Sequence, residues 1–241
     1  MTDNQTVTYR GFPISIKHDD VPASPREWDN LGTMVCSHPR YALGDVQVEA
    51  GETGFLEYLD QEYSIIADRA YRTLTESDEA MIRNWVQKQL ILLPLYLYDH
   101  GGITMNTTGF HCPWDTGQVG WIYVTRERVR NAYGVARISK QLEGVVQDQL
   151  RAEVAVYNDY LTGNVYGFDI PAIDTPDNSC WGFYGDDHET SGLLDMARQL
   201  IDGHIEAVTR AHVAKRKAQI KKRAPLERRE SLADRLSVHA L

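Results

Sequence analysis

The chain has 241 residues, of which 42% are hydrophobic and 24% charged, a composition typical of a globular protein with a full hydrophobic core. No apolar run approaches the roughly 18 residues of a membrane-spanning helix, and the first residues lack the basic and apolar regions of a signal peptide. We therefore expect a cytoplasmic protein with no membrane partner. The three cysteines, Cys36, Cys112 and Cys180, form no Cys-x-x-Cys pair, which favours reduced thiols over a disulfide framework.

Charge is distributed unevenly along the chain. The whole sequence carries 25 basic and 34 acidic residues, a net charge of −9. Residues 210–241 hold ten of the basic and three of the acidic ones, or +7, so residues 1–209 hold 15 and 31, or −16. This contrast indicates partners of opposite charge for the two parts, although an acidic protein with a solvated basic terminal helix is an equally good explanation.

The first part of the chain reads as strands followed by helices. Residues 6–16 are typical of a strand with a kink at Gly-Phe-Pro, residues 32–36 of a short strand and residues 37–52 of a loop. From Thr53, apolar residues recur with a period near 3.6, which predicts a helix. A second helix begins near Thr75, whose hydroxyl can cap it, and we expect its apolar face to hold Met81, Trp85 and Leu90.

The second part alternates strands with longer helices. A strand runs to Tyr98, a turn covers 99–102, and strands follow at 103–107 and 118–125. Thr125 and Ser139 cap two helices, which end at Gly134 and Gly163. Strands at 164–170 and 180–184 precede a last helical stripe from Leu194 to Val208.

These patterns predict an α+β fold in which a mostly antiparallel central sheet is flanked by amphipathic helices, with a basic C-terminal helical tail. We expect residues 1–209 to form a single acidic α+β globular domain and residues 210–241 to form the tail, helical to about Arg223.

The stretch "DHGGITMNTTGFHCPWDTGQVG", from Asp99 to Gly120, combines five glycines with two aspartates, two histidines and a cysteine. Asp99, Asp115 and the later Asp186 are candidate metal ligands, and with His111 they form the set that a metal-dependent hydrolase or nuclease would use. No pair has a spacing that defines a metal site, so we expect no cofactor and Cys112 without a metal. On the structural interpretation, the aspartates accept backbone hydrogen bonds in turns, and glycines such as Gly101 and Gly117 adopt positive φ.

Nucleophilic catalysis is a second possibility for this stretch. Cys112 lies next to His111, but adjacent residues on a strand point to opposite faces, so the two do not form a Cys–His pair by sequence position alone. If the protein is an enzyme, the candidate catalytic residues are Asp99, His111, Cys112 and Asp115. No glycine-rich phosphate-binding motif is present. Whether the protein is an enzyme therefore stays open, with the balance against it. We expect the side chains of Trp114, Trp121 and Trp181 to be largely buried.

Two charged groups are candidate binding surfaces. Asp186, Asp187 and Glu189 follow a strand and precede a helix, where carboxylates also serve as structural caps; together with Trp114 and Asp115 they are the candidate acidic surface. The tail contributes cations that could contact nucleic acid, a neighbouring subunit or the acidic body of the same chain, namely Lys215, Arg216, Lys217, Lys221, Lys222 and Arg223.

Four segments together resemble a known group of proteins: "PREWDNLGTMVC" (25–36), "LPLYLYDHGGITMNTTGFHCPWDTGQVGWIYV" (93–124), "VYNDYLTGNVYGF" (156–168) and "SCWGFYG" (179–185). The chain is similar, over about residues 9–187, to a family of uncharacterised proteins encoded by bacteriophages, plasmids and other mobile elements. The resemblance carries no catalytic residues. It implies an accessory protein in the cytoplasm of an infected or element-bearing bacterium, a class whose members often bind and disable host machinery.

Charge and resemblance together lead to one functional expectation. Clustered carboxylates can occupy a basic groove as a DNA backbone does. We therefore expect a phage- or plasmid-type accessory protein whose acidic surface binds a host nucleic-acid-handling or defence protein, in the manner of a DNA mimic or anti-defence inhibitor. A metal-dependent hydrolase or nuclease using Asp99, His111, Asp115 and Asp186 is the alternative. The basic tail adds nucleic acid or a homo-oligomeric contact as further partners.

Overall fold

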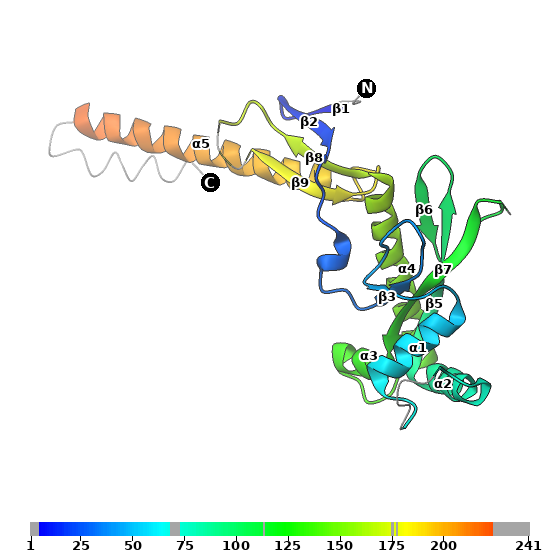
Figure 1. Ribbon diagram of the computed structural model, residues 1–241. Coiled ribbons are helices and arrows are strands. Elements are labelled where there is room, and N and C mark those ends of the chain that lie inside the picture. The colour runs from blue at the N-terminus through cyan, green and yellow to red at the C-terminus, as the bar shows by residue number, and fades with distance from the viewer. Residues whose placement is uncertain (1–4, 68–72, 113, 175, 177, 224–241) are drawn as a thin grey trace. The chain divides into compact units, whose positions relative to one another are not determined.

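The computed structural model describes residues 5–67, 73–112, 114–174, 176 and 178–223, and they form an α+β fold with five α-helices and two sheets (Figure 1). The chain divides into two compact units. Unit 1 comprises residues 1–19 and 166–241, and unit 2 comprises residues 20–165. From the sequence we expect one domain over residues 1–209, whereas the fold groups the N-terminal segment with the C-terminal part of the chain.

Unit 2 is built on a five-stranded sheet in the order β4-β3-β7-β5-β6, in which only the β3–β4 pair is parallel. The long β5–β7 pair is its centre, and the register shifts by one residue opposite Leu95 and Tyr96. The hairpin expected after Asp99 is confirmed as β5–β6. The strands are β3 (Thr33–Cys36), β4 (Val46–Gln47), β5 (Leu90–Asp99), β6 (Ile103–Asn106) and β7 (Thr116–Thr125).

Helices cover both faces of this sheet because β5 is apolar on both sides. Ile91, Leu95 and Leu97 pack with the stripe of α4 (Lys140–Thr162). The alternate residues Leu90 and Leu92 pack with α1 (Glu52–Tyr63) and α2 (Glu76–Gln89) on the opposite face. A short helix, α3 (Arg126–Tyr133), follows β7.

The expected helix boundaries are confirmed by their caps. The Thr75 hydroxyl accepts a hydrogen bond from the backbone of Asp78, whose side chain accepts one from the Thr75 N–H. The hydroxyls of Thr125 and Ser139 cap α3 and α4 by accepting hydrogen bonds from the backbone N–H groups of Arg128 and Leu142. Such bonds satisfy amide groups that otherwise lack partners.

Three expectations about the elements of this unit are wrong. Leu90 is the first residue of β5 and not part of the helical face, because α2 ends at Gln89. Met81 is 56% exposed, because the buried row of α2 is Ile82 and Val86, one residue further round the helix. The segment 37–52 is also not wholly a loop, since Val46 and Gln47 form β4 beside β3.

Unit 1 has a four-stranded antiparallel sheet in the order β1-β2-β8-β9. The first two strands form a hairpin rather than the kinked strand expected from the sequence. Arg10 and Gly11 between them have φ values of 49° and 86°, the two positive φ angles of a type I′ turn. The elements of this unit are β1 (Gln5–Tyr9), β2 (Phe12–His18), β8 (Val165–Asp169), β9 (Ser179–Tyr184) and α5 (Leu193–Arg223).

The long helix α5 changes its environment along its length. Its first half packs on one face of the sheet through Leu194, Ala197 and Ile201, against Ile14 and Phe168. Val208, expected at the edge of the core, is 54% exposed. The helix then continues past the sheet without a break (Figure 1), so the boundary expected at residue 209 falls inside a continuous helix.

Candidate functional site

The carboxylates of the Asp99–Gly120 stretch lie against other side chains of the protein itself. Asp99, at the end of β5, forms an ion pair with Arg40. Asp115 lies 3.2 Å from Nδ1 of His100, and its carbonyl accepts a hydrogen bond from the Asp99 N–H at 3.0 Å. The partners of the two carboxylates are thus the side chains of Arg40 and His100, whereas the structural interpretation of the sequence expected backbone N–H groups of turns.

The other candidate catalytic residues lie in different parts of the fold. His111 and Cys112 lie in the loop before β7, His111 exposed and Cys112 half-buried. The Cys112 carbonyl accepts a hydrogen bond from the Thr116 hydroxyl. Asp186 belongs to unit 1, whereas Asp99, His111 and Asp115 belong to unit 2. Across the described part of the chain, no group of three or more His, Cys, Asp or Glu side chains is placed to hold a metal ion.

Two of the three tryptophans expected to be buried are exposed. Trp114, in the loop before β7, is 89% exposed. Trp181 is 46% exposed, and it lies so close to Gly167 that a Cβ there would be 2.2 Å from its ring. Trp121 is partly buried and stacks on Phe55 with ring centroids 4.4 Å apart.

Asp187 and Glu189 have structural partners. The Asp187 carboxylate accepts backbone hydrogen bonds from Thr190 and Glu189, and these bonds hold the pKa of Asp187 below its usual value. Glu189 accepts two hydrogen bonds from Arg198, at 2.6 and 2.8 Å, which lower the pKa of Glu189. Both side chains stabilise the turn that leads into α5, so they are weaker candidates for a binding surface than their charge indicates.

Asp186 lines a pocket of unit 1 that the sequence does not predict. This cavity of about 380 Å³ lies beside Tyr166, whose ring centroid is 4.5 Å from that of His18 and 4.8 Å from that of His188. Nδ1 of His188 is buried without a hydrogen-bond partner among the described residues. The pocket combines aromatic and imidazole rings with a single exposed carboxylate.

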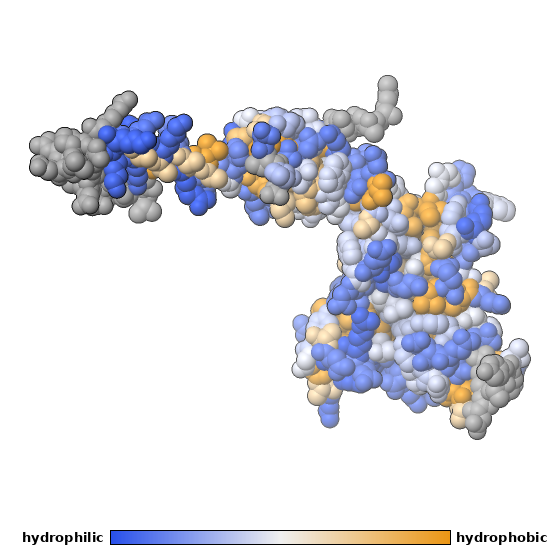
Figure 2. All heavy atoms as spheres, turned by 60° about the vertical axis from the view of Figure 1, so that its left-hand side comes forward, coloured by the Kyte–Doolittle hydropathy of each residue, from blue (hydrophilic) through white to orange (hydrophobic). Residues whose placement is uncertain are grey.

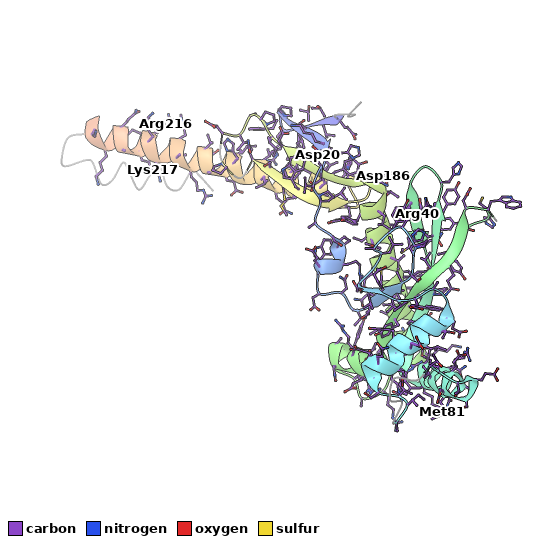
Figure 3. All side chains as sticks on the ribbon, viewed as in Figure 1. Asp20, Arg40, Met81, Asp186, Arg216 and Lys217 are labelled. Atoms are coloured by element: carbon purple, nitrogen blue, oxygen red, sulfur yellow. The ribbon has the colours of Figure 1, made fainter. Side chains whose placement is uncertain are left out.

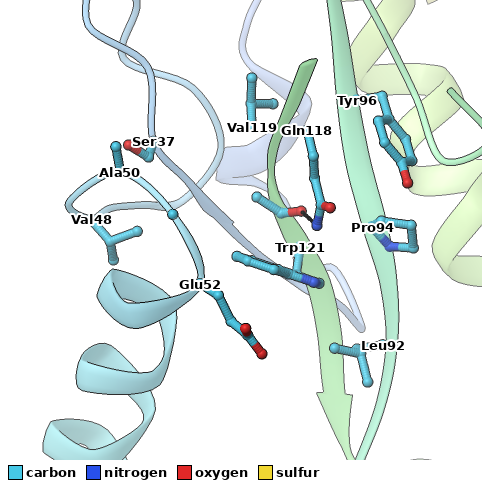
Figure 4. Close-up of a pocket in the computed structure, with 12 residues that line it drawn as sticks. Ser37, Val48, Ala50, Glu52, Leu92, Pro94, Tyr96, Gln118, Val119 and Trp121 are labelled. Atoms are coloured by element: carbon cyan, nitrogen blue, oxygen red, sulfur yellow. Dashed lines mark hydrogen bonds between the residues drawn. The ribbon is translucent and has the colours of Figure 1, made fainter. Parts of the chain in front are cut away.

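A larger cavity, of about 620 Å³, opens in unit 2 beside the first residues of α1 (Figure 4). Its wall on the sheet is formed by Leu92, Pro94 and Tyr96 of β5 and by Gln118 and Trp121 of β7. The volume is within the range of small-molecule sites. The rim carboxylate, Glu52, is paired with Arg83. The cavity is therefore mainly an apolar and aromatic surface, and its residues are too far apart in sequence for a motif to reveal it.

The exposed half of α5 is the most strongly charged feature of the protein. We call residues 207–223 of α5 the cationic arm. It contains Arg210, Lys215, Arg216, Lys217, Lys221, Lys222 and Arg223 and no acidic residue. Residues 206–212 are all exposed, as are Lys215, Arg216, Lys221 and Lys222. Figure 2 shows this part of α5 as predominantly hydrophilic, and Figure 3 shows Arg216 and Lys217 projecting from it.

Outside residues 210–241, both units of the protein are acidic. Unit 1 without residues 210–241 has three basic and 11 acidic residues, and unit 2 has 12 and 20, so each has a net charge of −8. The strong positive charge of residues 210–241, +7, is therefore confined to one segment of unit 1, and the part of that segment which the structure describes is helical.

Comparisons with protein-family models, with curated proteins and with solved structures find no match for this chain. Among the described helices, none combines the length and the apolar composition needed to cross a membrane. The function is therefore inferred from the geometry and charge of the chain itself.

Proposed function

We propose that this protein binds nucleic acid through the cationic arm, and that it is an accessory binding protein of the kind that mobile elements encode rather than an enzyme. The observation that carries the proposal is a helical segment with seven cations and no acidic residue, in which Arg210, Lys215, Arg216, Lys221 and Lys222 are exposed. Such a row of Lys and Arg side chains neutralises phosphates and releases their counterions, which is the main source of sequence-independent affinity for nucleic acid.

A purely structural explanation of the arm accounts for only part of its charge. Cations near a helix C-terminus offset the helix dipole, but this effect falls off within the last turn. Lys221, Lys222 and Arg223 lie in that turn, whereas Arg210, Lys215 and Arg216 lie further back. The exposure of Arg210, Lys215 and Arg216 leaves them available to a polyanion.

The test is binding of a fluorescein-labelled 20-base-pair duplex, measured by fluorescence anisotropy over a range of salt concentrations. We expect a linear fall of log affinity with log salt concentration. The triple variant Arg210→Gln, Lys215→Gln, Lys222→Gln should bind more weakly and flatten that slope by about 2 to 3, at ~0.9 per lost phosphate contact.

The matched control removes three exposed cations from unit 2: Lys88→Gln, Arg137→Gln, Lys140→Gln. It changes the net charge of the protein by the same amount, so equal losses in the two variants would show that overall charge, and not the arm, governs binding. Wild-type protein with no affinity for the duplex at low salt would overturn the proposal.

A second candidate function follows from Trp114. Exposed tryptophans are frequent energetic anchors of protein interfaces, and Trp114 is 89% exposed on a unit with a net charge of −8. We propose this loop as the contact of an acidic, DNA-mimic-like surface with a basic host defence enzyme. The proposal predicts that the protein inhibits a restriction or CRISPR nuclease, that excess duplex DNA relieves the inhibition and that Trp114→Ala weakens it. Inhibition unchanged by Trp114→Ala would show that Trp114 is not part of the contact.

The hydrolase alternative has less support. Asp99 and Asp115 are engaged by Arg40 and His100, and the residues that the structure describes include no group of three or more His, Cys, Asp or Glu side chains placed to hold a metal ion. A metal-dependent reaction needs several of these side chains around one ion.

A further inference from the structure

The cationic arm presents a face made only of small side chains. Ala207, Ala211, Ala214 and Ala218 are spaced by four, three and four residues. At 3.6 residues per turn, they fall within a sector of about 60° around the helix axis. All four are exposed, so this alanine face is not used to pack α5 on its own sheet.

Cations flank the alanine face on both sides. Lys215 and Lys222 lie roughly 50–70° from its centre in one direction, and Arg210, Lys217 and Lys221 lie about 50–90° away in the other. Arg216 lies on the opposite side of the helix. The arm therefore has a low, flat strip between two rows of long, positively charged side chains.

Three surfaces could face the alanine strip and its flanking cations: a second copy of the arm, an anionic membrane and duplex DNA. A second copy of the arm would place like charges against both rows, which is unfavourable. An anionic membrane requires bulky apolar side chains between the cations, and alanine supplies little apolar area. Two parallel rows of negative charge with a gap about as wide as a helix are found in the major groove of B-form DNA, which is ≈12 Å wide against a helix diameter of ≈10–12 Å.

We infer that the cationic arm binds in the major groove of B-form duplex DNA, with the alanine face toward the base edges and the two flanking rows on the phosphates of the two strands. This inference rests on the proposed function and narrows its ligand to duplex DNA. The small side chains allow the helix backbone to approach the floor of the groove, while the lysines and arginines reach outward to the backbones. A-form RNA has a major groove too deep and narrow for such a helix.

The experiment keeps the charge of the arm and changes only the shape of the face. Ala211→Leu, Ala214→Leu places two bulky side chains on the alanine face, and leucine is a good helix former. The matched control, His212→Leu, Gln219→Leu, places the same side chains on a different face of the arm, between the Lys215 and Arg216 rows. Circular dichroism establishes that both full-length variants keep the helix content of the wild type.

Affinities are measured for a 20-base-pair DNA duplex, an RNA duplex of the same length and heparin, a polyanion without a groove. We expect Ala211→Leu, Ala214→Leu to weaken DNA binding at least tenfold and to leave heparin binding within twofold, and the control to stay within twofold for both. DNA should also bind more tightly than the RNA duplex.

The outcomes separate this inference from the proposed function. If the arm's Lys and Arg substitutions abolish DNA binding but the alanine substitutions do not change it, nucleic-acid binding stands and the groove geometry is wrong. Equal loss of DNA and heparin binding in the alanine variant, or equal affinities for DNA and RNA, would also overturn the groove geometry. If the Lys and Arg substitutions have no effect on DNA binding, both proposals fail.

Discussion

At the scale of single residues, Arg26 is a charged side chain buried in unit 2. Its side chain is 6% exposed and donates hydrogen bonds to both Asp45 oxygens at 2.6 and 2.9 Å, to Glu153 and to the Gly32 carbonyl. Burial opposes the charged form, but Asp45 and Glu153 outweigh it and hold the pKa of Arg26 above its usual value. Glu153 also accepts the Leu31 N–H at 2.8 Å, so the cluster joins α4 to the segment that leads into β3.

Glu153→Ala should therefore strongly destabilise the protein. Arg26 keeps Asp45 as a partner in this variant, but the N–H groups of Leu31 and Gly32 lose their acceptor. A buried polar group left without a partner costs about 1–3 kcal/mol, which urea unfolding would measure as a loss in the free energy of unfolding. The control is Arg83→Ala, which breaks a solvent-exposed pair with Glu52 and Glu79 and should have a much smaller effect. Similar small losses in both variants would contradict the structural role of Glu153.

Gly120 is required by close packing of backbones in the sheet. A Cβ at this position would lie 2.0 Å from the Val35 carbonyl oxygen of β3, so Gly120→Ala should force the strands apart and lower the free energy of unfolding by about 1–3 kcal/mol. Gly117→Ala, in the same strand, is the control because a Cβ there meets nothing within 4 Å.

Gly117 also corrects an expectation from the sequence, since its φ is not positive, unlike the φ of 70° at Gly101. A β-branched residue should therefore be strained at Gly101 and tolerated at Gly117. Equal losses of stability for Gly117→Val and Gly101→Val in urea unfolding would contradict this assignment.

The three cysteines should differ in reactivity. Burial raises the pKa of the Cys36 thiol from 9.0 to about 12, whereas Cys112 and Cys180 are half-buried. Because the thiolate is the reactive form, we expect iodoacetamide at pH 8 to modify Cys112 and Cys180 of the native protein and to spare Cys36. Peptide mass spectrometry would show this, with all three modified in urea; native Cys36 reacting as fast as Cys180 would contradict it.

The raised pKa of Cys36 also has a consequence for stability. The folded state favours the neutral thiol, so this contribution is complete below pH 9.0 and is lost as the pH rises toward about 12.

At the scale of elements, α5 joins a structural part to the arm that we propose binds DNA. Leu193 to Ile205 complete the core of unit 1, while the arm has no part in the hydrophobic cluster of that unit. Because the helix is continuous, the arm begins where α5 leaves the core of unit 1 and follows the axis of that helix. A flexible basic tail would have no fixed direction.

Truncation after Thr209 should separate these two parts. Because Leu194, Ala197 and Ile201 remain, we expect the thermal midpoint of the truncated protein to stay within a few degrees of the full-length value. Salt-sensitive binding of duplex DNA should be lost. A truncated protein that fails to fold would show that the arm stabilises unit 1, and retained DNA binding would place the binding surface elsewhere.

At the scale of the whole molecule, the two units differ in how the chain forms them. Unit 2 is one continuous segment, residues 20–165, with two hydrophobic clusters on the two faces of its sheet. Unit 1 needs both ends of the chain, because β2 from the N-terminal segment pairs with β8 and lies between β1 and β8 in its sheet.

Deletion of residues 1–19 should therefore unfold unit 1 selectively. It removes β1 and β2, including the buried Ile14 and Ile16, while residues 20–165 retain their own core. We expect backbone amide hydrogen exchange to lose protection in α5 and β9 and to keep it in β5, β7 and α4. Loss of protection throughout the chain would show that unit 2 depends on unit 1 for its stability.

The sequence by itself determined the local features. The caps at Thr75, Thr125 and Ser139 and the stops at Gly134 and Gly163 depend on hydrogen bonds and φ angles within a few residues, so neighbouring letters are enough to predict them. The same holds for the α+β class and for the concentration of positive charge after Thr209.

Only the tertiary structure decided which side chains are covered and which distant groups meet. Tryptophan is a large aromatic residue, so the sequence led us to expect Trp114 and Trp181 in the core, whereas both are exposed. Whether such a side chain is covered depends on the packing of whole elements. Arg26 and Glu153 are 127 positions apart, and Tyr9 reaches Asp202 across 193. Such contacts depend on closing long loops and on the packing of whole elements, and no periodicity along the chain encodes them.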